Sequence, residues 1–143
     1  SGLTIGGGVE SVEDDSGLLL ASGTTESTGY VKYAMGGLSA AYQEAYTDSV
    51  NGTGTEGADV ETSFWGVAYT AGDFTVSYAE STSQTSAVSD TAQTLESELD
   101  SLQIAYVVGA MTISGAMSET ANPAGTTTVG TYEENTLAVS FAF

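Results

Sequence analysis

The residues of this chain that could do chemistry are almost all oxygen ligands. The chain has nineteen Asp and Glu residues, a single basic residue, Lys32, and neither His nor Cys. It therefore lacks an imidazole base, a thiolate nucleophile, a disulfide framework and the nitrogen and sulfur ligands of the usual zinc sites. Adjacent hydroxyl and carboxyl groups such as Ser89 and Asp90 have no base to activate them. We expect neither enzymatic activity nor an organic cofactor.

The best candidate for metal binding is a short run of carboxylates. Its members are Glu13, Asp14 and Asp15, with Glu10 upstream. Carboxylate oxygens are the ligands that Ca²⁺ and Mg²⁺ prefer in proteins. The run lacks the spacing of a calcium-binding loop, so a solvated acidic loop is the simpler interpretation. A loosely bound Ca²⁺ or Mg²⁺ is the most that this run predicts.

The net charge restricts the partners of the chain. Its formal value is −18 at pH 7. Nucleic-acid phosphates are recognised by clusters of Lys and Arg, so nucleic acid is an implausible partner. The charge should instead attract cations and hold divalent ions that bridge to lipopolysaccharide phosphates. Glu96, Glu98 and Asp100 alternate and could share such a cation, with a solvated acidic segment as the alternative.

The remaining composition describes the elements that must position these residues. Hydrophobic residues are 41% of the chain and aromatic residues 9%, which is enough apolar surface for an ordered structure. Eighteen Gly, one Pro and many Thr, Ser, Val and Tyr residues favour strands and turns over helices. No apolar run approaches the roughly 18 residues of a transmembrane helix. We expect one all-β domain, or half of one, over residues 1–143.

One sequence unit occurs three times, at residues 31–42, 67–78 and 104–115. In each copy an apolar residue is followed two positions later by Tyr and three positions after that by Gly. A large apolar residue and then Ser or Thr come after the Gly. The glycines, Gly36, Gly72 and Gly109, supply the positive φ that short hairpin turns require. Each unit is therefore predicted to be a β-hairpin.

Partial copies at both ends extend the pattern to eight strands, with both ends on the short-turn side. The predicted strands are 3–10, 28–35, 38–46, 62–70, 74–81, 102–109, 111–118 and 135–143. The predicted connections on the other side are long: 11–27, 47–61, 82–101 and 119–134. Of the nineteen carboxylates only Asp73 lies in a short turn, and the other eighteen lie in or beside the long connections.

Along the predicted strands, large apolar side chains alternate with small, mildly polar ones. In a soluble sandwich the apolar faces would meet in a core, whereas in a membrane barrel they face lipid and the small polar faces line the lumen. Strands of about 9–11 residues are long enough to cross a membrane. The barrel interpretation predicts the pore-lining candidates Lys32, Thr75, Ser77, Gln103, Thr112, Ser114, Thr136 and Ser140. It predicts membrane-girdle aromatics at Tyr33, Trp65, Tyr69, Tyr78, Tyr106, Phe141 and Phe143.

Short turns on one side and long acidic loops on the other are typical of bacterial outer-membrane barrels. The hairpin unit at 67–78 and the alternating ending at 135–143 resemble the C-terminal half of an alphaproteobacterial trimeric general porin. The resemblance implies an antiparallel transmembrane β-barrel of about sixteen strands, of which eight are visible, and a homotrimer. It also implies that Phe143 is read by the barrel-assembly machinery. The basic lining cluster of that family is absent, since Lys32 stands alone.

A complete eight-stranded barrel is the alternative to a partial larger one. Side chains fill the interior of eight-stranded barrels, and the small inward residues of this chain would fill it poorly. The larger barrel is therefore the preferred expectation. Its function would be passive diffusion of small hydrophilic solutes and ions across the outer membrane of a Gram-negative cell, with a preference for cations. Two other functions stay open: a non-channel outer-membrane barrel with adhesive, phage-receptor or structural loops, and a soluble β-rich surface-layer or adhesin module.

Overall fold

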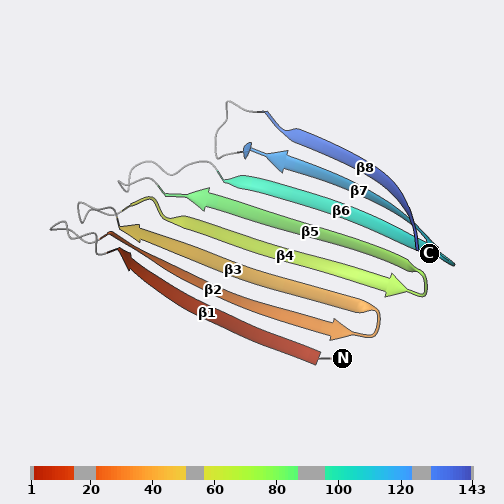
Figure 1. Cartoon of the computed structure of the whole chain (residues 1–143), viewed down its shortest axis with the longest axis horizontal. Helices are drawn as coiled ribbons and strands as arrows, with labels where there is room; N and C mark the ends of the chain where they lie inside the picture. The colour runs from red at the N-terminus through yellow and green to blue at the C-terminus, as the bar shows by residue number, and fades with distance from the viewer. Residues whose placement is uncertain (1, 15–21, 51–56, 87–95, 124–129, 143) are drawn as a thin grey trace.

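The computed structural model describes residues 2–14, 22–50, 57–86, 96–123 and 130–142 (Figure 1). Its eight strands are β1 (Gly2–Asp14), β2 (Ser22–Met35), β3 (Leu38–Val50), β4 (Val60–Ala71), β5 (Phe74–Thr85), β6 (Ser97–Val108), β7 (Met111–Ala121) and β8 (Tyr132–Phe141). They form one sheet in chain order, and each strand pairs antiparallel with the next. The all-β, eight-stranded, up-and-down expectation is confirmed.

Two-residue turns join the strands at one end of the sheet. Gly36, Gly72 and Gly109 have φ of 59°, 60° and 62°, which is the left-handed region that side chains with a Cβ avoid. These are the glycines that the repeated unit predicts. The start of β1 and the end of β8 lie at the same end of the sheet as the short turns (Figure 1).

The strands continue further toward the long connections than their apolar alternation indicates. For example, β3 runs to Val50 and β5 to Thr85, four residues past the expected ends in each case. The extra segments are rich in Ser and Thr, which fit a pleated sheet and can bond across it. One such bond joins the hydroxyls of Ser63 and Thr82 at 2.8 Å. Polar strand ends show no apolar alternation. The strands predicted from that alternation are therefore shorter than the observed ones.

The sheet has two edges, β1 and β8, and is not closed into a barrel. A pattern of alternating residues predicts which strands are neighbours. Closure into a barrel depends on whether the edge strands β1 and β8 pair with each other or with further strands. The expected sixteen-stranded barrel is therefore not present in this structure. The observed unit is a single eight-stranded layer (Figure 1).

The layer has no core among the residues that the structure describes, none of which is buried. Large apolar side chains remain exposed along the whole sheet: Ile5 is 73% exposed, Val9 76% and Leu137 79%. An apolar surface of this size is removed from water in stable proteins. The described part of the chain contains no helix that is long and apolar enough to span a membrane.

Candidate functional site

The candidate functional site is the pair of opposite faces of the sheet, and the strand register defines both. One face, here called the apolar face, carries the cross-strand row Leu3, Tyr33, Ala40, Val67, Tyr78, Leu102, Met117 and Asn135. The next row belongs to the opposite face, here called the polar face, and consists of Thr4, Lys32, Ala41, Gly66, Ala79, Ser101, Ser118 and Glu134. Because side chains alternate along every strand, each row extends into a face that spans all eight strands.

All eight pore-lining candidates lie on the polar face. Seven of them cluster on β5 to β8, where Ser77 pairs with Gln103 and Thr112 pairs with Ser140. The row that contains Ser77 and Gln103 continues through Ala116 to Thr136. A shallow hollow of about 180 Å³ lies over this region. Lys32 is on the same face, on β2. The structure thus gathers the seven uncharged candidates and keeps Lys32 apart from them.

The predicted girdle aromatics of the described strands lie on the apolar face. Tyr33, Tyr69 and Tyr106 are each two residues before the end of their strand at the short turns. Trp65 and Tyr78, further along, have ring centroids 5.3 Å apart with an angle of 52° between the planes. Such tilted aromatic pairs are favourable contacts in sheets. Phe141 ends β8, and Phe143 lies outside the described residues.

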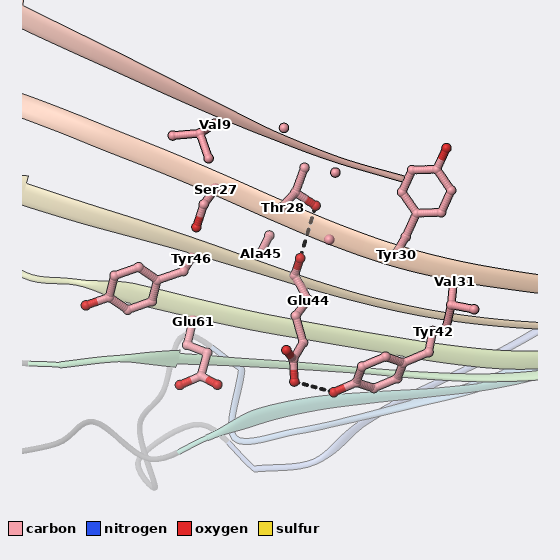
Figure 2. Close-up of a pocket in the computed structure, with 13 residues that line it drawn as sticks. Val9, Ser27, Thr28, Tyr30, Val31, Tyr42, Glu44, Ala45, Tyr46 and Glu61 are labelled. Atoms are coloured by element: carbon pink, nitrogen blue, oxygen red, sulfur yellow. Dashed lines mark hydrogen bonds between the residues drawn. The ribbon is translucent and has the colours of Figure 1, made fainter. Parts of the chain in front are cut away.

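The apolar face is not continuous, because small and acidic residues occur within it. On the apolar face a hollow of about 800 Å³ lies above the glycine pair Gly7 and Gly29 (Figure 2). Tyr42 and Glu44 stand beside this hollow, and the Tyr42 hydroxyl donates a hydrogen bond to the Glu44 carboxylate (Figure 2). The apolar face is therefore interrupted over β1 to β3 by this hollow and by the Glu44 carboxylate. Sequence alternation assigned neither feature.

Carboxylates gather at the long-connection end of the apolar face. Glu80 pairs directly with Asp100, Asp100 with Glu119, and Glu119 with Glu133. Carboxylate oxygens of Glu80, Glu98 and Asp100 lie within 4.8 Å of one another, a spacing that could hold a metal ion. Like charges in directly opposed positions destabilise a sheet. The alternation of Glu98 and Asp100 was visible in the sequence, but Glu80 was missed because only the strand register brings it to this cluster.

The predicted Glu13, Asp14 and Asp15 site lies only partly within the described residues, so it stays a prediction. In the backbone register of β1 and β2, Glu13 pairs with Gly23 and Asp14 pairs with Ser22. Asp15 lies outside the described residues. In the part of the chain that the structure describes, Glu80, Glu98 and Asp100 form a group with metal-binding spacing.

The pKa of the Glu98 carboxyl is raised above its usual value. The neighbouring Asp100 carboxylate is the main cause, and desolvation and Glu80 contribute further. The folded protein therefore holds the Glu98 proton more tightly than the unfolded chain does. As the pH rises through the range between the unfolded and folded pKa values, folding loses stability because Glu98 must ionise beside other carboxylates.

Glu98→Gln is expected to raise the melting temperature at neutral pH, and the difference from the unchanged protein should shrink below about pH 4, where the carboxyl is protonated in both states. Thermal unfolding in detergent micelles between pH 3 and 8 would measure it. Glu134→Gln is the matched control, because Glu134 lies on the polar face of β8. An equal gain from both variants would show that general charge reduction, rather than the cluster, sets the effect.

A scan of protein-family models finds no match to this chain, and a search of curated proteins finds none either.

Proposed function

We propose that this sheet is part of the wall of an outer-membrane diffusion pore that passes small hydrophilic solutes and ions. The observation that carries the proposal is the separation of the two faces. An apolar face lies opposite a face made mostly of Gly, Ala, Ser and Thr, and none of the described residues is buried. This is the arrangement of a barrel wall between lipid and water.

The height of the apolar face supports a membrane rather than a protein core. On β6 the apolar face runs from Val108 at the short turn to Leu102, and Asp100 follows as the first carboxylate. Eight residues separate Val108 and Asp100, which at about 3.3 Å per residue and a tilt near 40° is roughly 20 Å of height. Bacterial outer-membrane barrels have apolar bands of about 25 Å.

The polar face and the two sheet edges favour a wide barrel over a narrow one. Small residues such as Ala41, Gly66 and Ala79 leave space that an eight-stranded barrel would need to fill with side chains. Further antiparallel strands at β1 and β8 would pair the edges and enclose a hydrated lumen. A barrel of about sixteen strands, a homotrimer of such barrels and insertion by the barrel-assembly machinery belong to the same proposal.

The carboxylates at the long-connection end of the sheet, here called the acidic rim, are the reason to propose a preference for cations. They include Glu80, Asp100, Glu119 and Glu133. With a net charge of −18 the field at the long-connection end should enrich cations and repel anions. The outward carboxylates from Glu80 to Glu133 would face lipopolysaccharide, whose phosphates they could reach only through shared divalent cations.

The proposal is tested by conductance in planar lipid bilayers with single-cysteine variants, which are clean probes because the chain has no Cys. We expect stepwise currents whose reversal potential in a KCl gradient favours K⁺. A bulky water-soluble thiol reagent should label Ser77→Cys on the polar face and reduce the current. It should leave Val76→Cys, the neighbouring position on the apolar face, unlabelled in lipid.

Three outcomes would contradict the pore. Protein that is inserted but leaves the bilayer sealed would favour a non-channel barrel with adhesive or structural loops. Protein that stays monodisperse without detergent would favour a soluble surface module. Equal labelling of Ser77→Cys and Val76→Cys in lipid would show that the two faces do not separate lipid from water.

A further inference from the structure

Lys32 is the one Lys or Arg in a chain with nineteen carboxylates, yet its neighbours on the polar face are uncharged. Thr4 and Ala41 are its direct cross-strand partners. The diagonal positions on the same face are Gly2, Gly6, Ser39 and Gln43. Gln43 donates its side-chain N–H to Thr28 at 3.1 Å, which turns its amide toward the long-connection end. The register therefore places no carboxylate beside the Lys32 ammonium.

Lys32 borders a hollow of about 510 Å³ on the polar face. The floor of the hollow is formed by small residues of the next strands, among them Ala41, Gly66, Ala68 and Ala79. A pocket that is mostly apolar and has one charged group at its rim is the usual form of a site for a small organic ligand.

Phe64 on β4 also lines this hollow. Its ring leans along β4 over Gly66, since a Cβ added at Gly66 would lie 3.3 Å from the Phe64 Cζ atom. Gly66, Ala41 and Lys32 share one cross-strand row. Two strand spacings separate β2 from β4, which is about 9–10 Å. A body the size of one aromatic ring fits above Ala41, with Lys32 on one side and the Phe64 ring on the other.

We propose that this hollow is a binding subsite for small carboxylates with an apolar body. The carboxylate pairs with the Lys32 ammonium, and the apolar body lies on the alanine floor against the Phe64 ring. The place of the subsite inside a pore rests on the proposed function, but its binding chemistry rests only on the described strands.

Two classes of solute share this chemistry. One is a simple monocarboxylate such as benzoate, and the other is a zwitterionic amino acid with an apolar side chain, such as phenylalanine. The acidic rim repels a net anion but does not repel a net-neutral zwitterion. Titration with each probe in the experiment below therefore distinguishes the two sources: tighter binding of benzoate assigns the subsite to monocarboxylates, and tighter binding of phenylalanine assigns it to zwitterionic amino acids.

The test uses NMR of the full chain in detergent micelles, labelled with lysine that carries ¹³C at Cε. Because Lys32 is the only lysine, the labelled protein gives one side-chain signal. Titration with benzoate should shift this signal saturably, and titration with benzyl alcohol should not. Acetate, which has the charge but no apolar body, should bind more weakly by about threefold or more.

Phe64→Ala should weaken benzoate binding by about two- to tenfold, as expected for the loss of one aromatic contact. Tyr132→Ala is the matched control, because Tyr132 is an aromatic residue of the polar face on the distant strand β8. It should leave the affinity unchanged. Equal affinities for acetate and benzoate, no saturable shift, or equal losses in the two variants would each overturn the proposal. A pore that conducts without such binding would separate this failure from failure of the proposed function.

Discussion

Ile104→Arg is expected to lower the free energy of unfolding in lipid bilayers by about 2–4 kcal/mol, the cost of an arginine on the lipid face near the middle of a membrane. Ile104 lies on the apolar face, where it is 49% exposed. It is four residues from Val108 at the short turn and four from Asp100 at the acidic rim. A guanidinium at this height is held far from both water layers. Urea unfolding of protein in lipid vesicles would measure the loss.

Gln103→Arg supplies the matched control, since the neighbouring residue points to the polar face. In a hydrated lumen the new guanidinium keeps its water, so we expect a change in stability below about 0.5 kcal/mol. The same variant should shift the reversal potential toward anions, because it adds a cation to a wall with little positive charge. A larger loss for Gln103→Arg than for Ile104→Arg would invert the assignment of the two faces.

Gly37→Ala is expected to destabilise the protein by about 1–3 kcal/mol, the usual cost of forcing extra atoms into a close contact. A Cβ on Gly37 would lie 2.0 Å from the carbonyl oxygen of Thr70. The same two residues are linked by a hydrogen bond of 2.8 Å from the Thr70 N–H to the Gly37 carbonyl. The first turn must therefore move away from β4, and that bond is lost. Chemical unfolding in detergent would show the lower midpoint.

Gly29→Ala makes the same chemical change inside β2, where a Cβ meets no atom within 4 Å. Alanine has less conformational freedom to lose than glycine, so this control is expected to be neutral or to stabilise by up to about 1 kcal/mol. A similar loss in both variants would mean that chain flexibility, rather than the contact with Thr70, requires glycine at position 37.

Local patterns account for the parts of the fold that the sequence predicts well. The three turn glycines were found because a positive φ imposes one residue type at one place in a repeated unit. The eight strands and their order were found because short turns force neighbouring strands to pair antiparallel. The strand ends toward the long connections, such as Thr47 to Val50 of β3, extend beyond the predicted strands because Ser, Thr and charged residues there carry no apolar period.

The candidate sites also divide into features that one strand determines and features that need several strands. Alternation was enough to assign Lys32 and Ser77 to one face and Trp65 to the other, since each assignment needs only the parity of one strand. The cluster at Glu80 and the hollow between Lys32 and Phe64 combine residues of different strands. Such groups depend on register, and a shift of one residue would move every side chain of a strand to the opposite face.

The chemical range of the protein was determined by the sequence alone, because the absence of His and Cys and the net charge of −18 follow from residue types in any conformation. Its hairpins were determined by local steric rules. Only the tertiary structure decided that Lys32 faces uncharged partners while Glu80, Asp100, Glu119 and Glu133 stand side by side. The physical reason is that hydrogen bonds between strands set the register, and register alone brings residues distant in the chain within reach of one another.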